Sequence, residues 1–95
     1  MAAARKKPRQ RKLARVDQYR SRAYRELQAR LLENVRSVRL ERGLSQEEAA
    51  HRCEMATRIL QRVEAGEVNL TLTSLARLCE GLQVDVVRLF RSGKK

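Results

Sequence analysis

The sequence has no tryptophan and only three aromatic residues, Tyr19, Tyr24 and Phe90. A core built from such a chain must be aliphatic, with Leu, Val and Ala as its main residues. Alternation of apolar and polar residues, the signature of strands, is absent, so the aliphatic pattern favours packed helices over a β-sandwich. With 95 residues, the chain has room for one small domain.

Cysteine, histidine and glycine are also scarce. Cys53 and Cys79 have no zinc-site spacing, and His51 is the only histidine. No nucleophile has a plausible base beside it, and no glycine-rich phosphate loop occurs. We therefore expect neither enzyme activity nor a cofactor. Apolar neighbours around both cysteines predict buried thiols, which fits a reducing cytoplasm.

Long apolar runs are missing from the sequence. No stretch is apolar enough to cross a membrane, and no apolar run follows the basic first residues as it would in a secretory signal. These absences predict a cytoplasmic protein without a membrane partner.

Positive charge is abundant, with a formal net charge of +11. Residues 1–30 hold 11 Lys/Arg and 2 Asp/Glu, whereas residues 31–95 hold 11 and 9. The excess therefore lies in an N-terminal segment beside a nearly balanced domain. Such a segment favours a polyanionic partner, nucleic acid ahead of a membrane surface, although a solvated tail has the same composition.

The chain divides into four parts. Residues 1–12 form a basic arm without expected fixed structure, and residues 13–29 an amphipathic helical extension. Residues 30–91 form the folded domain, and residues 92–95 a basic tail. The extension has an apolar stripe that could pack on the domain, pair with a second copy or bind a protein partner. It joins the domain as one long helix or with a bend near Ala29. The stripe from Leu13 to Leu31 consists of Leu13, Val16, Ala23, Tyr24, Leu27 and Leu31.

Five helices are predicted in the domain from periodicity and capping residues. Gly43 ends the first, Ser45 and Glu48 form a capping box at the second, and Gly66 ends the third. Thr71 and Asp85 are N-caps of the last two. The predicted ranges are 29–42, 45–53, 57–65, 71–80 and 85–90. Leu72, Leu75, Ala76, Leu78 and Cys79 form the apolar side of the fourth, and Val86, Leu89 and Phe90 close the core.

The pair of short helices at 45–53 and 57–65 is the most informative feature. Ala50 supplies the small residue that two closely crossing helices need, and Leu60 and Val63 anchor the second helix. The outward side chains of that helix are able to bond base edges or phosphates. They are Thr57, Arg58, Gln61 and Arg62.

From about Leu31 to Phe90 the sequence resembles the Cro/cI-type (XRE-like) family of DNA-binding domains. The shared residues, in order, are Leu44-Ser45-Gln46-Glu47-Glu48-x-Ala50, Leu60-x-Arg62-Val63-Glu64-x-Gly66, Asn69, Leu72, Leu75, Leu78, Val84 and Leu89-Phe90.

The resemblance implies an all-α, five-helix Cro/cI repressor-like helix-turn-helix domain that binds double-stranded DNA as a homodimer. The residue matching Gln46 contacts backbone phosphate, and those matching Thr57, Arg58 and Arg62 face the major groove. Arg39 and Glu64 match an ion pair of the scaffold. Gln61 and Asn69 complete the predicted DNA-contact residues of the domain.

Several positions depart from the family pattern. Glu54 replaces the glycine of the turn, and Ala56 replaces a Ser- or Thr-like cap, each at a cost of roughly 1 kcal/mol. Glycine comes early, at Gly81 rather than at Gln83. The loop after the helix at 57–65 reads Glu67-Val68-Asn69 and lacks basic residues. These changes weaken the contacts of the domain with DNA phosphates. The basic arm could supply the missing contacts by following the backbone or by entering a minor groove. Its residues are Arg5, Lys6, Lys7, Arg9, Arg11 and Lys12.

Three functions remain open. The leading hypothesis is a sequence-specific, nucleoid-associated transcription regulator that acts as a dimer, a repressor ahead of an activator. The second is a protein-interaction module, antitoxin-like or a complex subunit, in which the Leu13–Leu31 stripe binds a partner helix. The third is a nonspecific nucleic-acid binder that works through the arm alone.

Overall fold

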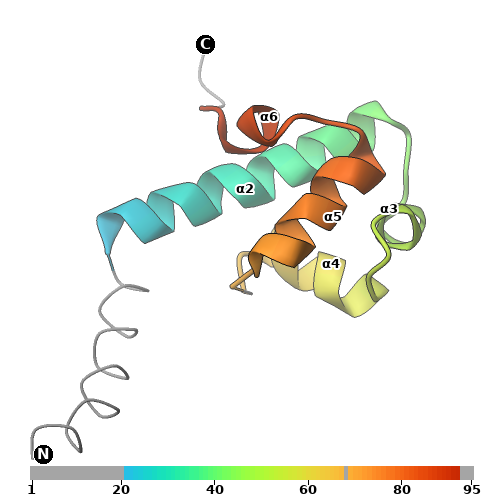
Figure 1. Cartoon of the computed structure of the whole chain (residues 1–95), viewed down its shortest axis with the longest axis horizontal. Coiled ribbons are helices and arrows are strands. Elements are labelled where there is room, and N and C mark those ends of the chain that lie inside the picture. The colour runs from blue at the N-terminus through green and yellow to red at the C-terminus, as the bar shows by residue number, and fades with distance from the viewer. Residues whose placement is uncertain (1–20, 68, 93–95) are drawn as a thin grey trace, which may run out of the picture.

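The computed structural model describes residues 21–67 and 69–92, and this part of the chain forms five helices (Figure 1). The all-α, five-helix architecture predicted from the sequence is confirmed. No strand occurs in the described ranges. The helices are α2 (Arg22–Glu41), α3 (Gln46–Arg52), α4 (Thr57–Ala65), α5 (Leu72–Leu82) and α6 (Val86–Phe90).

Helix α2 is the longest of the described elements, and α4, α5 and α6 contact it (Figure 1). It passes through Ala29 without interruption, so the end of the predicted extension and the first helix of the domain are one helix. The hydroxyl of Ser21 accepts a hydrogen bond from the Tyr24 N–H at 3.0 Å and caps its start. Beyond its end, Gly43 adopts φ +68°, a conformation that glycine takes without a Cβ penalty. The arm, Leu13, Val16 and residues 93–95 lie outside the described residues.

Three helices have the N-cap residues that the sequence predicted. At α3, Ser45 and Glu48 form the reciprocal capping box, and the Ser45 N–H donates to Glu48 Oε1 at 2.8 Å. This hydrogen bond to its charged form lowers the pKa of Glu48. Thr71 caps α5 by accepting from the Ser74 N–H, and Asp85 caps α6 by accepting from the Val87 N–H.

The core is aliphatic, as the scarcity of aromatic residues required. It lies between α2, which contributes Val35 and Val38, and the inner faces of the four shorter helices. Helices α4 and α6 both pack on α2, and α3 packs on α4 and α5. The buried apolar residues are Val35, Val38, Leu44, Ala49, Ala50, Cys53, Leu60, Val63, Leu78, Leu82 and Leu89.

Three residues that were predicted to pack inward are exposed instead. Leu72 is 81% exposed and Val86 is 44% exposed. Leu72 and Val86 are the first residues of their helices, so no preceding helical turn covers their side chains. Ala76, on the predicted apolar side of α5, is also exposed.

Gly81 lies inside α5 and does not end it. A Cβ atom at this position would stand 2.6 Å from Cys53 Cα and 2.7 Å from the Arg52 carbonyl oxygen, so only glycine lets the end of α3 approach α5 this closely. The left-handed residue that ends α5 is Gln83, with φ +56°. The early glycine therefore serves helix packing rather than helix termination.

The two thiols are free and differ in burial. Cys53 is fully buried, as predicted, whereas Cys79 is partly buried. Burial, reinforced by the neighbouring Cys79, raises the pKa of Cys53 to about 11. Burial also raises the pKa of Cys79. Both sulfurs therefore stay protonated at neutral pH and behave as small apolar groups.

Helix α6 is tied to α2 through the buried amide of Asn34. Its Nδ2 donates to the carbonyl oxygens of Leu89 at 3.0 Å and Arg91 at 2.8 Å, while its Oδ1 accepts from Arg88 Nη1 at 2.9 Å. These bonds satisfy carbonyls that the end of a helix leaves without partners. Within the described residues, no helix is long and apolar enough to cross a membrane.

Candidate nucleic-acid interface

Helices α3 and α4 are joined by a tight turn. Glu54 has φ +54°, the left-handed backbone expected where the family usually has glycine. The Met55 N–H donates to the Ala50 carbonyl at 3.0 Å, which closes the end of α3. Ala56 then starts α4 without a side-chain hydrogen bond to the helix, as predicted. The turn is therefore formed by two residues whose side chains do not favour it.

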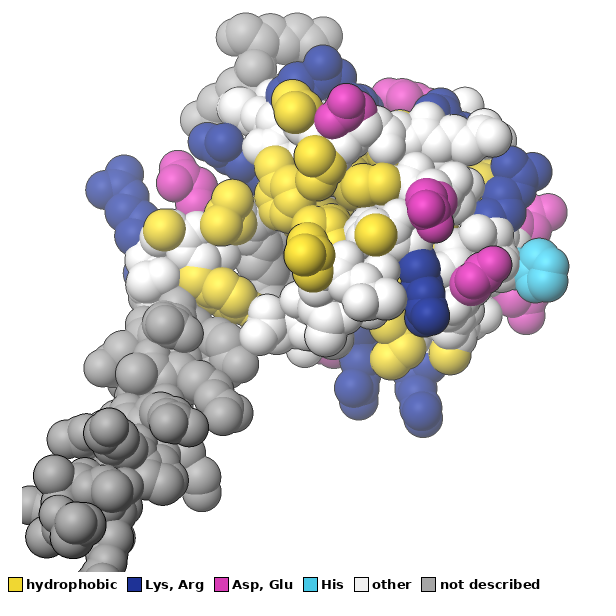
Figure 2. Space-filling view, viewed as in Figure 1, with side chains coloured by type: hydrophobic (Ala, Val, Ile, Leu, Met, Phe, Trp, Pro, Cys, Tyr) yellow, Lys and Arg dark blue, Asp and Glu magenta, His cyan; other side chains and the backbone are white. Residues whose placement is uncertain are grey.

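Helix α4 has one buried and one exposed face. Leu60 is 0% exposed and Val63 is 3% exposed, so these two residues anchor the helix in the core. Arg58 and Arg62, one turn apart, are exposed on the other face together with Gln61. Thr57 is partly buried at the first helical position. Arginine side chains, dark blue in Figure 2, project from the lower edge of the molecule where α4 lies (Figures 1 and 2).

The guanidinium groups of this face are available for an external anion. Among the residues that the structure describes, neither Arg58 nor Arg62 has an ion-pair partner. Glu64, the acidic residue on the same helix, is directed towards α2 and engaged by Arg39. The outer face of α4 therefore has unneutralised positive charge and amide hydrogen-bonding capacity side by side.

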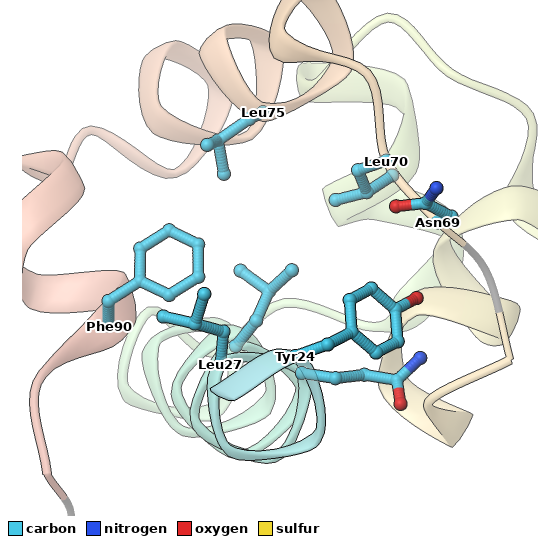
Figure 3. A pocket seen from close by; sticks show the side chains of 8 residues that line it. Tyr24, Leu27, Asn69, Leu70, Leu75 and Phe90 are labelled. Carbon is cyan, nitrogen blue, oxygen red and sulfur yellow. The ribbon is translucent and has the colours of Figure 1, made fainter. Parts of the chain in front are cut away.

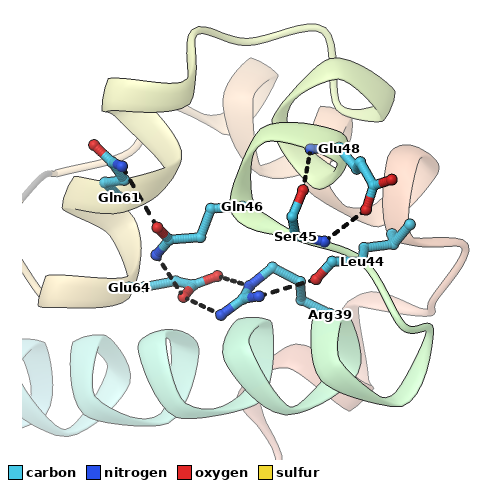
Figure 4. Close-up of polar contacts among 7 residues, drawn as sticks. All are labelled: Arg39, Leu44, Ser45, Gln46, Glu48, Gln61 and Glu64. Atoms are coloured by element: carbon cyan, nitrogen blue, oxygen red, sulfur yellow. Dashed lines mark hydrogen bonds and ion pairs between the residues drawn. The ribbon is translucent and has the colours of Figure 1, made fainter.

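The Arg39–Glu64 ion pair holds α4 against α2 (Figure 4). Arg39 Nε donates to Glu64 Oε2 at 2.7 Å and Nη2 donates to Oε1 at 3.0 Å, a bidentate geometry. A third nitrogen, Nη1, donates to the Leu44 carbonyl at 2.9 Å, directly before α3. The pair has the scaffold role that was predicted for it, because Arg39 bonds both Glu64 in α4 and the Leu44 carbonyl just before α3.

Gln46 extends this network from α3 to the exposed face of α4 (Figure 4). Its Nε2 donates to Glu64 Oε1 at 3.1 Å, and its Oε1 accepts from Gln61 Nε2 at 3.5 Å. The sequence indicated Gln46 as a DNA contact but carried no signal for this side-chain engagement, because the three residues come close only through the helix crossing.

The structure brings most predicted site residues of the domain together. Gln46, Thr57, Arg58, Gln61 and Arg62 lie on the adjoining faces of α3 and α4. Asn69 is separate from them: it lies in the segment between α4 and α5, at the rim of an apolar groove. The predicted arm residues Arg5, Lys6, Lys7, Arg9, Arg11 and Lys12 are outside the described part of the chain.

The sequence did not predict that groove as a site (Figure 3). It has a volume of about 250 Å³ and lies between the first half of α2, the start of α5 and the end of α6. The stripe residues Tyr24, Leu27 and Leu31 form its α2 wall, and Leu27 is 50% exposed. The sequence signal that could have indicated this groove was the helical periodicity of the apolar stripe. The remaining lining residues are Gln28, Asn69, Leu70, Leu75 and Phe90.

Comparison with known families agrees with this geometry. A family model described as helix-turn-helix matches residues 35–89, more than half of the chain. The chain belongs to the Cro/cI-type helix-turn-helix family. The match extends from Val35 in α2 to Leu89 in α6, and so includes every buried core residue of this helix-turn-helix domain.

One solved structure is similar over most of its length. The crystal structure of a hypothetical transcription factor, NHTF, from Neisseria shares 30% sequence identity with this helix-turn-helix protein, with a TM-score of 0.67. The alignment covers 70% of this chain and 77% of that chain. Comparison with curated proteins gave no match.

Proposed function

We propose that this protein is a transcription regulator that binds double-stranded DNA with α4 in the major groove. The observation that carries the proposal is the outer face of α4, where exposed Arg58, Gln61 and Arg62 stand opposite the buried anchors Leu60 and Val63. A guanidinium group binds guanine O6 and N7 as a fork, and a carboxamide binds adenine N6 and N7. Family membership and the similarity to a hypothetical transcription factor support the same function.

The other predicted contacts fall into two groups in this proposal. Gln46 and Thr57 flank the exposed face of α4 and would contact the edge of the groove. Asn69 and the arm, which lie apart from that face or outside the described residues, would contact phosphates. Phosphate contacts orient a protein on the duplex, whereas base contacts specify the sequence.

Selection of bound sequences from random duplex DNA tests the proposal. We expect the wild-type chain to enrich a defined sequence, and the Arg58→Ala/Arg62→Ala variant to lose that preference by roughly tenfold or more. The variant Arg36→Ala/Arg77→Ala removes the same charge from exposed positions on α2 and α5 and serves as the control. It should enrich the wild-type sequence. A wild-type chain without preference, or a double α4 variant that selects the same sequence, would refute the proposal.

We further propose that the protein acts as a repressor and as a homodimer whose second copy docks on the apolar groove. The groove wall contains exposed Leu27, and exposed Leu72 and Val87 lie on the neighbouring helices α5 and α6. None of the lining residues belongs to α4, so a copy bound there leaves Arg58 and Arg62 accessible to DNA. Two copies on one site would exclude other proteins from that stretch of duplex.

Sedimentation equilibrium with the Leu27→Glu variant tests the dimer. We expect a dimer for the wild type and a monomer for the variant, because a buried unpaired carboxylate opposes association. Glu33→Gln, at an exposed position of the same helix, is the control and should dimerise. A monomeric wild type would instead favour the protein-interaction module, in which a partner helix occupies the groove.

A further inference from the structure

The groove between α2, α5 and α6 has a polar side and an apolar side (Figure 3). The hydroxyl of Tyr24 and the amide of Asn69 lie on one side of it, whereas Leu75 and Phe90 lie on the other. Ligand sites in proteins combine mostly apolar walls with a few polar groups that fix orientation. The groove therefore suits a molecule that has a hydrogen-bonding head and an apolar remainder.

The amide of Gln28 is the group best placed to bind such a head. Its Cδ would stand 4.0 Å from a Cβ atom at Gly66, at the end of α4, so it belongs to the same side of the groove as Asn69. The side chain is partly buried and has no hydrogen-bond partner within the described part of the chain. A carboxamide offers both a donor and an acceptor, which together match an amide of the ligand.

The lining of the groove carries no charge among the residues that the structure describes. The guanidinium of Arg30, beside the Phe90 end, is engaged elsewhere. Its Nη1 donates to the Phe90 carbonyl oxygen at 3.4 Å, and its Nη2 lies 3.8 Å from Glu26 Oε2. A charged ligand would lose hydration in the groove without meeting an opposite charge, so the groove favours an uncharged molecule.

The α2 wall of the groove belongs to the part of the chain that precedes the family match. Tyr24, Leu27, Gln28 and Leu31 all come before residue 35, where the match begins. The groove therefore exists because this extension packs on the domain, and it is a feature added to the helix-turn-helix fold.

We propose that the groove binds an uncharged amphipathic molecule, with an amide head at Gln28 and an alkyl chain against Leu75 and Phe90. A cavity of about 150 Å³ holds a benzene ring, so a volume of about 250 Å³ suits a molecule of about ten non-hydrogen atoms. Binding at this site does not require DNA. A molecule that covers Leu27 also occupies the surface proposed for the second copy, so it would release the dimer, and this consequence rests on the proposed function.

The experiment uses octanamide as the probe and saturation-transfer NMR on the full chain, at a protein concentration at which sedimentation equilibrium shows monomers. Octanoate has the same alkyl chain with a charged head. We expect octanamide to bind at roughly millimolar concentration or below, and octanoate to bind about tenfold more weakly or worse. The proposal is overturned if octanamide shows no saturable binding, or if octanoate binds as tightly.

Two variants locate the bound probe. Leu27→Trp fills the groove from a position that is 50% exposed, and should lower the affinity for octanamide about tenfold or more. Leu40→Trp, 58% exposed further along α2 and outside the groove, is the control and should bind as the wild type does. Gln28→Leu keeps the approximate size of the side chain, removes the amide and should weaken binding about fivefold. Unchanged affinity in either groove variant would contradict the proposed site.

The effect of octanamide on association separates this site from the proposed function. Saturating octanamide should raise the dissociation constant of the wild-type dimer in sedimentation equilibrium. A dimer that persists with octanamide bound would mean that the second copy docks elsewhere, and the ligand site would stand. The selection of duplex DNA is carried out without the probe, so its failure would bear on the proposed function alone.

Discussion

Ala56 is an unfavourable N-cap for α4, because its side chain has no oxygen that could accept a hydrogen bond from the first N–H groups of the helix. It occupies the N-cap of α4 with extended backbone angles, φ −67° and ψ 144°, which are those of a capping serine. The backbone is thus already arranged for a side-chain oxygen that alanine lacks. We predict that Ala56→Ser stabilises the fold by about 1 kcal/mol.

The measurement for Ala56→Ser is the free energy of unfolding from urea denaturation. Ala56→Gly is the control, because glycine also suits an N-cap but supplies no side-chain acceptor. Serine should stabilise more than glycine does. An unchanged midpoint for the serine variant would mean that the first N–H groups of α4 already have other partners.

Cys53 offers a second test at this scale, based on its thiol pKa. The thiolate is the reactive form, and a pKa raised from 9.0 to about 11 leaves ~100-fold less thiolate at pH 8 than an ordinary thiol has. We predict that in the Cys79→Ala variant, which keeps the burial of Cys53 and loses only the smaller contribution of Cys79 to its pKa, the folded protein reacts with a disulfide reagent roughly tenfold or more slowly than the same variant in denaturant. The rate should increase with pH up to the raised pKa. Equal rates in both states would contradict the burial of this sulfur.

At the level of elements, one buried ion pair joins α4 to α2. Replacing Arg39 by Met leaves the Glu64 carboxylate buried with only the Gln46 donor. We therefore predict that Arg39→Met destabilises the fold by about 3 kcal/mol, and that Arg39→Met/Glu64→Leu is more stable than Arg39→Met alone. Urea denaturation of both single variants and the double variant gives the coupling energy. Additive effects would show that the pair contributes no interaction energy.

The N-caps of three helices were predictable because their signals are local. Ser45 with Glu48, Thr71 and Asp85 each bond an N–H two or three residues away, so short stretches of sequence contain the whole interaction. The face of α4 was predictable for the same reason: Leu60 and Val63 recur at helical spacing, and the polar residues between them must point outwards.

Features that depend on helix crossings were not predictable from local patterns. The need for glycine at Gly81 depends on the close approach of α3 to α5. The engagement of Gln46 by Glu64 joins residues 18 apart in the sequence. The groove likewise combines segments of three helices. Such contacts require the tertiary arrangement.

Across the whole molecule, the uneven distribution of charge predicts that the arm adds affinity for DNA and that α4 determines the base sequence. The arm of residues 1–12 contains six of the basic residues, whereas the exposed face of α4 contains the side chains suited to base contact. We predict that deleting residues 1–12 lowers affinity for duplex DNA and reduces the slope of log K against log salt by about 0.9 for each phosphate that the arm neutralises in the full chain. The selected base sequence should not change.

Binding titrations of the full and truncated chains at several salt concentrations measure this slope. The Arg36→Ala/Arg77→Ala variant shows how far a loss of charge elsewhere on the surface reproduces the effect. An affinity and a slope identical to those of the full chain would remove the arm from the mechanism.

The hydrogen bond between Gln46 and Gln61 has a practical consequence for anyone who retargets this domain to new operators. A library that randomises position 61 alone would leave the Gln46 carbonyl facing side chains that cannot donate to it, and would under-represent good solutions. Positions 58 and 62, whose side chains have no ion-pair partner among the described residues, can be varied independently. Positions 46 and 61 should therefore be randomised together in one library.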